Sequence, residues 1–263
     1  MQKISFIGSG NMATALAKLI LSKKIAKEIV MSDKNQEKLS IAKKNLKIKT
    51  AKSNIEAAKS SDIVFLSVKP QDIPEVLDEI SAEIKNQLIV SIAAGITLSF
   101  LQSKLKKARI IRVMPNIACL AGEMAAGFSL GKFAEKKDGQ IIKNILDSAG
   151  KSFLVEEEKL DAVTAISGSG PAFIAYFLDA MIASAISNGL GKEQATLLAE
   201  QTALGTAKLM LEKQISPEEL IKMVASKGGT TEAGLIVFEQ NNLKQTIKTA
   251  ISKAVERSRK LGK

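Results

Sequence analysis

The sequence predicts a doubly wound α/β domain in the N-terminal part of the chain, followed by an all-α domain. As far as about residue 155, short runs rich in Ile, Val and Leu alternate with helical patterns. This order is expected of parallel strands joined by helices. After Glu156–Glu158 the apolar runs stop, and alanine-rich helical segments continue to the end. We therefore expect one domain over residues 1–157 and a second over residues 158–263.

Five strands are expected in the first domain. Their near-continuous apolar content suits strands of a parallel sheet that helices cover on both faces. They are Ile4–Ile7, Ile29–Ser32, Ile63–Val68, Leu88–Ile92 and Ile110–Met114.

Two helical features are expected in the second domain. Ser216-Pro217-Glu218-Glu219 predicts a helix start, with Ser216 as N-cap and Glu219 closing a capping box. The apolar stretch Pro171–Ile186 carries Asp179, and it is shorter than the roughly 20 residues needed to span a bilayer. We expect it to form a buried helix.

The composition excludes several kinds of chemistry. The chain has no histidine, which removes Ser-His-Asp and Cys-His nucleophiles and His-based metal sites, so no metal is expected. The single Cys119 cannot form an internal disulfide, and no signal-peptide pattern precedes the first strand. Both observations favour a cytoplasmic location. The net charge of +11 is spread along helical segments with few aromatic residues, so nucleic acid is not an expected partner. The shortness of the apolar stretch Pro171–Ile186 likewise leaves no membrane partner expected.

A glycine-rich loop follows the first predicted strand and opens a helical pattern. Its sequence is Gly8-Ser9-Gly10-Asn11-Met12-Ala13, with alanine in place of the third glycine of a dinucleotide fingerprint. Glycines let such a loop turn sharply and approach a pyrophosphate at a helix N-terminus. The loop predicts a Rossmann-like domain that binds a nicotinamide dinucleotide.

The residues after the second strand bear on which coenzyme is bound. They are Ser32-Asp33-Lys34. A carboxylate at Asp33 favours the ribose of NADH, whereas Ser32 and Lys34 could accommodate the 2′-phosphate of NADPH. Asp33 could also be only the N-cap of the next helix. The sequence leaves the choice between NADPH and NADH open.

Six stretches, taken in order, resemble motifs of the pyrroline-5-carboxylate reductase family over almost the whole chain. Two positions depart from the family pattern, namely Ile117, where threonine is usual, and Lys227, where proline is usual. The six stretches are Gly8–Met12, Ser67–Pro70, Ser91–Ile96, Arg112–Asn116, Ser167–Ala172 and Gly228–Thr231.

The resemblance implies hydride transfer to the imine carbon of 1-pyrroline-5-carboxylate, giving L-proline in the last step of proline biosynthesis. It also implies a dimer with intertwined helical domains, which can assemble further into a decamer, and an active site with residues from both subunits. By position, Thr231 is the catalytic residue that hydrogen-bonds the ring nitrogen. The substrate-binding residues implied are Ser226, Gly228, Gly229, Thr230, Thr231, Ser169 and Asn116. The cofactor-binding residues implied, besides Gly8–Met12 and Ser32–Lys34, are Asn54, Val68, Lys69, Pro70, Ala93, Ala94 and Gly95.

An imine also suits the composition independently of the family. An imine nitrogen can be protonated before hydride arrives, so its reduction needs no strong general acid such as histidine. Tyr176 is followed at the fourth position by Ala180 rather than lysine, unlike short-chain dehydrogenases. No lysine lies between Asp161 and Gly191, unlike β-hydroxyacid dehydrogenases.

Other interpretations stay open from the sequence. The scaffold could reduce a different imine, serve a deazaflavin-linked oxidoreductase, or belong to a non-catalytic dinucleotide-binding regulator. Ser167–Gly170 could be only a helix-breaking turn, and Gly228–Thr231 only a helix start with threonine as N-cap.

Overall fold

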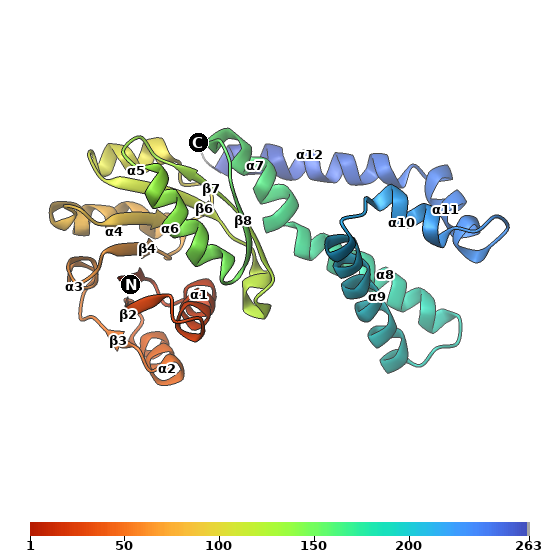
Figure 1. Ribbon diagram of the computed structural model, residues 1–263, viewed down its shortest axis with the longest axis horizontal. Helices are drawn as coiled ribbons and strands as arrows, with labels where there is room; N and C mark the ends of the chain where they lie inside the picture. The colour runs from red at the N-terminus through yellow and green to blue at the C-terminus, as the bar shows by residue number, and fades with distance from the viewer. Residues whose placement is uncertain (262–263) are drawn as a thin grey trace. The chain divides into compact units, whose positions relative to one another are not determined.

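The computed structural model describes residues 1–261, and its contacts divide the chain into two units (Figure 1). The first unit contains Met1–Ser169 and the end of the chain from Ala254, and the second contains Gly170–Lys253. Composition placed the boundary earlier, at residue 157. The structural division lies after Ser169 because helix α7 (Leu160–Val163) packs on the sheet. The side chains of Leu160 and Val163, at its two ends, lie against Gly127 of the sheet.

The first unit is built around a sheet with strand order β3-β2-β1-β4-β5-β6-β7-β8. Neighbouring strands are parallel, except that β6 and β7 are antiparallel. The order reverses between β1 and β4, which is the kind of point where open α/β sheets bind ligands. The strands are β1 (Gln2–Ile7), β2 (Ala26–Ser32), β3 (Lys49–Thr50), β4 (Ile63–Leu66), β5 (Leu88–Ser91), β6 (Arg109–Met114), β7 (Met124–Leu130) and β8 (Gly150–Leu154).

The doubly wound fold and all five expected strands are confirmed, as β1, β2, β4, β5 and β6. Three strands were not predicted. The strand β3 has only two residues, β7 is rich in alanine and glycine, and β8 leaves most of its residues unburied. None of the three therefore shows the continuous Ile, Val and Leu run that marks a strand covered on both faces.

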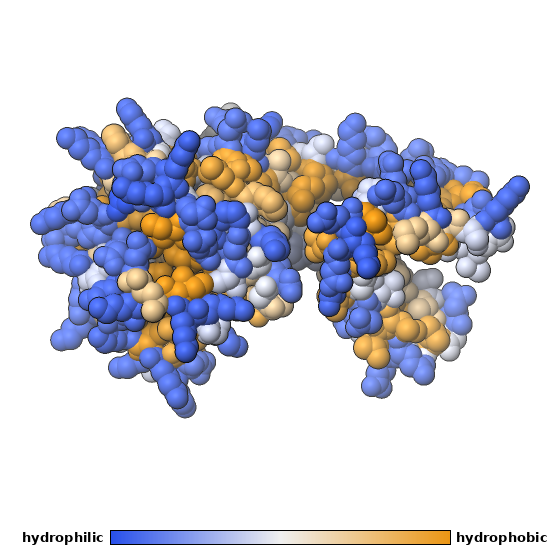
Figure 2. All heavy atoms as spheres, viewed as in Figure 1, coloured by the Kyte–Doolittle hydropathy of each residue, from blue (hydrophilic) through white to orange (hydrophobic). Residues whose placement is uncertain are grey.

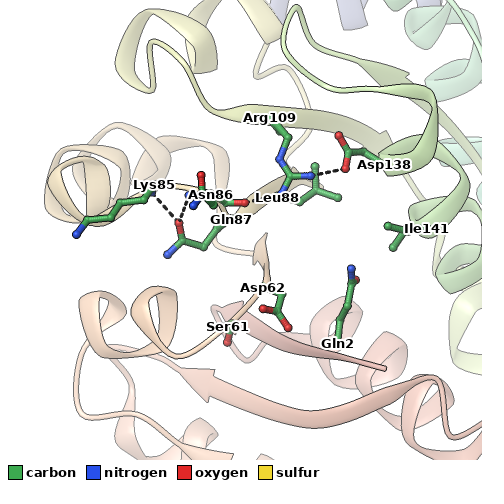
Figure 3. Close-up of a pocket in the computed structure, with 10 residues that line it drawn as sticks. All are labelled: Gln2, Ser61, Asp62, Lys85, Asn86, Gln87, Leu88, Arg109, Asp138 and Ile141. Atoms are coloured by element: carbon green, nitrogen blue, oxygen red, sulfur yellow. Dashed lines mark hydrogen bonds and ion pairs between the residues drawn. The ribbon is translucent and has the colours of Figure 1, made fainter.

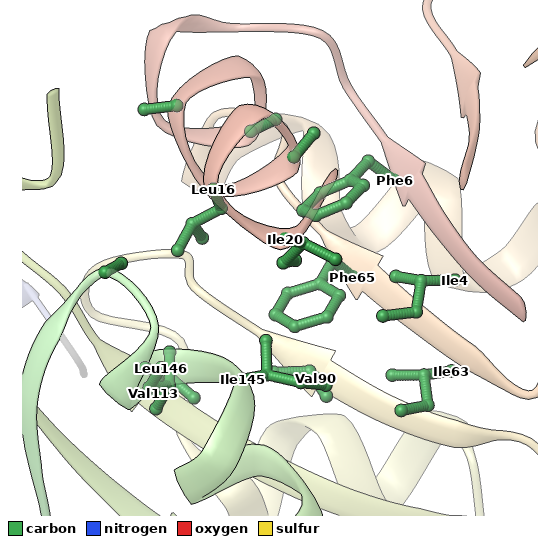
Figure 4. Close-up of a cluster of buried hydrophobic side chains, with 14 of the residues drawn as sticks. Ile4, Phe6, Leu16, Ile20, Ile63, Phe65, Val90, Val113, Ile145 and Leu146 are labelled. Carbon is green, nitrogen blue, oxygen red and sulfur yellow. The ribbon is translucent and has the colours of Figure 1, made fainter. Parts of the chain in front are cut away.

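Helices cover both faces of the sheet, and alternate residues of each strand point to opposite faces. Ile4 and Phe6 join a core with α1, α2 and α6, whereas Ile7 joins a second core with α3, α4 and α5. Phe6 and Phe65, paired across β1 and β4, stack with ring centroids 4.8 Å apart (Figure 4). The helices are α1 (Asn11–Ser22), α2 (Gln36–Leu46), α3 (Asn54–Lys59), α4 (Ile73–Ile80), α5 (Leu98–Lys104) and α6 (Lys136–Asp147).

The second unit is helical. It contains α8 (Gly170–Ser187), α9 (Lys192–Lys213), α10 (Pro217–Val224), α11 (Thr230–Gln240) and the start of α12 (Leu243–Leu261). The predicted capping box is confirmed at α10. The Ser216 hydroxyl accepts from the Glu219 N–H at 3.2 Å, and the Glu219 carboxylate accepts from the Ser216 N–H at 2.7 Å.

The prediction that Pro171–Ile186 is a buried helix is wrong for the single chain. No residue of α8 is buried, and Tyr176 is 81% exposed. Figure 2 shows apolar side chains on the surface of the second unit. The helical stretch Glu157–Ser187 is long and apolar enough to cross a membrane by length and composition alone. Within residues 1–261, α9 packs beside α8 and Phe177 lies against Phe238 of α11, with ring centroids 6.5 Å apart, but these neighbours bury no residue of α8. Complete burial of this helix therefore requires something beyond these contacts.

Candidate active site

The first glycine of the fingerprint is required by a close approach between two strand ends. Gly8 has φ +98°, and a Cβ atom on it would lie 2.7 Å from the carbonyl oxygen of Ser67, the residue after β4. The Gly8 N–H donates to the Ser32 carbonyl at 2.8 Å. A side chain at position 8 would therefore clash with the backbone and strain the turn.

The second glycine has a different reason to be there. Gly10 is the N-cap of α1, with φ −69°, and no atom lies within 4 Å of the position its Cβ would take. No side chain caps the first amides of α1. An open approach to uncapped helix amides is what a pyrophosphate needs, so the residues present fit a dinucleotide.

Asp33 is bonded to the glycine-rich loop. One carboxylate oxygen accepts from the Ser9 N–H at 2.7 Å and from the Ser9 hydroxyl at 2.8 Å, and the other accepts from the Asn35 N–H at 2.8 Å. Burial alone would raise the pKa of Asp33, but these hydrogen bonds and nearby Lys38 lower it below its ordinary value. Asn35, whose side chain accepts from the Lys38 N–H at 3.0 Å, is the N-cap of α2. Asp33 is therefore not a helix cap.

The other residues at the end of β2 also have partners within the chain. The Ser32 hydroxyl donates to the Asn54 amide oxygen at 2.8 Å, and the Asn54 amide nitrogen donates to Glu79 at 2.7 Å. The Lys34 ammonium lies 2.7 Å from a carboxylate oxygen of Asp72, and its side chain is 78% exposed. The fold thus joins Ser32 directly to Asn54, although 22 residues separate them in sequence.

The remaining cofactor residues follow the carboxyl ends of parallel strands. Val68, Lys69 and Pro70 come after β4, and Ala93–Gly95 come after β5. They therefore lie at the same edge of the sheet as the glycine-rich loop. Asn116 follows β6 and is buried, and its amide oxygen accepts from the Ala125 N–H at 3.1 Å, at the start of β7.

A cavity of about 520 Å³ lies at the opposite, amino-terminal edge of the sheet (Figure 3). Gln2, Asp62 and Leu88 line it at or beside the starts of their strands. Arg109 lies across it, in an ion pair with the buried carboxylate of Asp138. Ligands of doubly wound sheets bind at the carboxyl ends of the strands, so this cavity is not the predicted cofactor site.

The substrate loop lies in the second unit, at the start of α11. Gly228 has φ +71°, and its N–H donates to the Glu232 carboxylate at 2.6 Å. Gly229 is the N-cap, and a Cβ atom there would lie 2.6 Å from the Ser226 hydroxyl. A helix does start here, as one interpretation of the sequence proposed, but no side chain caps α11. Threonine is not its N-cap, because Thr230 and Thr231 are already inside the helix.

Thr231 lines a largely apolar cavity of about 560 Å³ within the second unit. The walls come from α9, α10 and α11, including Leu209, Leu220 and Leu235. Glu232 was not among the predicted site residues. Its place three residues after the N-cap is a capping-box spacing that could have identified it from sequence.

The Ser-Gly-Ser-Gly stretch is not a helix-breaking turn. Thr164–Gly168 forms a π-helical turn that leads into α8. The Ser167 hydroxyl donates to the Ala125 carbonyl at 2.5 Å, and the Ser169 N–H donates to the Thr164 carbonyl at 2.9 Å. π-Helical turns are frequent at functional sites.

Comparisons with known proteins follow the same two-part division. A family model described as NADP oxidoreductase, coenzyme F420-dependent, matches residues 3–95, and a model described as pyrroline-5-carboxylate reductase dimerisation matches residues 157–261. Pyrroline-5-carboxylate reductase 2 of Bacillus subtilis is 38% identical over 262 residues, covering 98% of this chain and 94% of the relative. This chain belongs to the pyrroline-5-carboxylate reductase family. The family is one of NAD(P)-dependent oxidoreductases.

Solved structures agree with membership in the pyrroline-5-carboxylate reductase family. The enzyme of Coxiella burnetii has a TM-score of 0.95 at 33% identity, covering 100% of this chain and 99% of that one. The Plasmodium falciparum enzyme, solved with NADP bound, has a TM-score of 0.89 at 30% identity, covering 100% and 98%. The coenzyme F420 model matches only the dinucleotide-binding half, whereas the reductase similarity extends over both halves.

Proposed function

We infer that this protein reduces 1-pyrroline-5-carboxylate to L-proline with NADPH or NADH. The observation that carries the proposal is the pairing, in one chain of this family, of the open glycine-rich loop with the Ser226–Thr231 loop. The first suits a dinucleotide pyrophosphate, and the second suits a small carboxylate at a helix N-terminus.

The first unit would bind the dinucleotide, which supplies a hydride when bound. The uncapped amides at the start of α1 meet the pyrophosphate charge. Ser32–Lys34 and Asn54 are the proposed contacts of the adenosine half, and Val68–Pro70 with Ala93–Gly95 are the proposed contacts of the nicotinamide half.

The second unit would bind the imino acid. The N–H groups of Thr230 and Thr231 form the positive end of the α11 dipole, which favours the substrate carboxylate. The N–H groups of Gly228 and Gly229 already donate within the loop, to Glu232 and to the Ser226 carbonyl, and so hold its shape. The Thr231 hydroxyl is the proposed hydrogen-bond partner of the ring nitrogen. Asn116 and Ser169 are proposed as further substrate contacts.

The reaction adds a hydride to the imine carbon and leaves a proton on the ring nitrogen, which converts the C=N bond into the C–N bond of proline. The nitrogen can take its proton from water before the hydride arrives. The chain then needs only to orient the iminium, a task within reach of a threonine hydroxyl in a chain without histidine.

A second copy of the chain is the proposed cover for α8. The match to a dimerisation model over residues 157–261 includes this helix, whose apolar side chains are exposed in one chain. We further propose assembly into a decamer in the cytoplasm, with neither nucleic acid nor membrane as partner. Light scattering of the purified protein should give at least the mass of a dimer.

The activity is tested with purified protein, synthetic 1-pyrroline-5-carboxylate and either NADPH or NADH. Loss of cofactor absorbance should be matched by formation of proline. Failure of both cofactors to be oxidised above background would overturn the proposal.

The competing activities have their own assays. A six-membered cyclic imino acid tests a different imine, and reduced coenzyme F420 with NADP tests the deazaflavin alternative suggested by the match over residues 3–95. Faster turnover in either assay than with 1-pyrroline-5-carboxylate would reassign the enzyme.

A further inference from the structure

The end of α12 returns to the first unit and is bonded there to α7 (Figure 1). The Ser258 hydroxyl donates to a carboxylate oxygen of Asp161 at 2.6 Å, and Ser258 is only 7% exposed. Arg259 adds an ion pair, with its Nε 3.8 Å from the other oxygen of Asp161. The Arg259 side chain is largely exposed, so its ion pair is weak, and the partly buried hydrogen bond from Ser258 to the charged carboxylate is the main attachment.

One helical turn further on, the backbone of α12 meets the turn after β5. A Cβ atom on Gly95 would lie 2.8 Å from the carbonyl oxygen of Leu261, and Gly95 has φ +78°. Glycine is therefore required at position 95 for two reasons: the left-handed backbone conformation, and the close approach of the C-terminal helix, which leaves no room for a side chain.

The far side of the same turn is held by a second carboxylate. Glu157 accepts from the N–H of Leu98, the first residue of α5, at 2.7 Å, and from Arg112 at 2.8 Å. Glu157 lies on the short turn before α7, and Asp161 lies four residues later, within α7. Glu157 thus holds the start of α5, and Asp161 holds the end of α12, whose Leu261 lies against Gly95.

We propose that the end of α12, residues 258–261, positions the Ala93–Gly95 turn for the nicotinamide half of the cofactor, with Asp161 and Ser258 as positioning residues. This proposal rests on the proposed function, because it needs a dinucleotide bound across the carboxyl edge of the sheet. The contacts lie at the turn after β5, away from the Ser9–Asp33 bonds at the end of β2. The adenosine half should therefore bind independently of the C-terminal helix.

The test compares two ligands on three proteins. A chain that ends at Arg257 loses Ser258 and Leu261, and isothermal titration calorimetry measures its affinities for NADPH and for 2′,5′-ADP, which lacks the nicotinamide. We expect the dissociation constant for NADPH to rise about tenfold, the factor that corresponds to one lost hydrogen bond to a charged group. The constant for 2′,5′-ADP should change less than about twofold. Arg257→Ala, an exposed substitution on the same helix, is the matched control and should change neither constant.

Two further variants keep the proposal testable if the shortened chain does not fold. Ser258→Ala should weaken NADPH binding in the same selective way, and Ser258→Thr, which keeps the hydroxyl, should restore it. An equal loss of affinity for NADPH and for 2′,5′-ADP, or no change in either affinity, overturns the proposal. An unaltered chain that binds NADPH but does not reduce the imine overturns only the proposed function, and one that binds no dinucleotide overturns both.

Discussion

The backbone N–H and the hydroxyl of Ser9 both donate hydrogen bonds to one oxygen of the Asp33 carboxylate, at 2.7 and 2.8 Å. The bonds tie the glycine-rich loop to the end of β2, across 24 residues of sequence. Since the other oxygen accepts from the Asn35 N–H at 2.8 Å, both oxygens of Asp33 already accept hydrogen bonds within the chain. The carboxylate therefore orders the loop before any coenzyme arrives.

Replacing Asp33 by Ser should weaken the binding of both coenzymes and should not change the preference between them. Loss of the bonds to Ser9 loosens the loop, so we expect KM for NADPH and for NADH each to rise about tenfold. Their ratio should change less than about threefold in steady-state kinetics. A large shift towards NADPH alone would instead identify Asp33 as a ribose ligand.

Acid should weaken the same connection. Because the pKa of Asp33 is lower in the folded chain than its ordinary value of 3.8, its contribution to folding is complete above pH 3.8. The contribution is lost as the pH falls through the folded pKa. Chemical denaturation at pH 7 and pH 3 should therefore show a smaller acid-induced loss of stability in Asp33→Asn than in the unaltered chain.

Alanine at the two fingerprint glycines should have different effects, on stability at Gly8 and on coenzyme binding at Gly10. Gly8→Ala places a Cβ 2.7 Å from the Ser67 carbonyl at φ +98°, and it should lower the free energy of unfolding by about 1–3 kcal/mol. Gly10→Ala enters open space at φ −69°, so the fold should keep its stability while NADPH binding is lost. Thermal unfolding and calorimetry separate the two, and a stable Gly8→Ala would contradict the close approach.

Thr231→Ala should impair reduction of the imine without changing the affinity for the coenzyme. Loss of one neutral hydrogen bond predicts a fall of up to about tenfold in kcat/KM for the imino acid. Thr231→Ser keeps the hydroxyl and serves as the control. An equal loss of NADPH affinity in the alanine variant would place Thr231 in another role.

Glu232 should act through the substrate carboxylate. Its bond to the Gly228 N–H holds the left-handed turn before α11, so Glu232→Ala should raise KM for 1-pyrroline-5-carboxylate about tenfold. Glu232→Gln, which keeps an acceptor, should recover most of the loss. With 1-pyrroline, which has no carboxylate, the alanine variant should behave like the unaltered enzyme, and an equal defect there would argue against this role.

Cys119 should resist thiol reagents in the folded protein. Burial raises its pKa from the ordinary value of 9.0 to about 11, which lowers the thiolate fraction near neutral pH roughly 100-fold. Ellman's reagent at pH 8 should react slowly with the native chain and rapidly in guanidinium chloride. Equal rates in both states would show that the thiol is accessible.

Local patterns in the sequence were sufficient for much of the fold. The five Ile-, Val- and Leu-rich strands were predicted because their side chains are covered on both faces of the sheet. The capping box at Ser216 was predicted because its chemistry lies within four residues. The strand β7 was missed because it lacks a run of Ile, Val and Leu, and its Gly127 lies against Leu160 and Val163 of α7, a neighbour that only the folded chain brings into contact.

The sequence by itself determined the glycine-rich loop, the five apolar strands of a doubly wound domain and the absence of imidazole chemistry, since each depends on residue type and short spacing. Only the tertiary structure showed that Asp33 accepts hydrogen bonds from Ser9 and does not cap a helix, because two neighbouring parallel strands bring the two residues together. It likewise decided that Gly95 accommodates Leu261, 166 positions further along the chain. The exposure of α8 was also beyond the sequence, because an apolar segment looks the same whether its own chain or a second copy covers it.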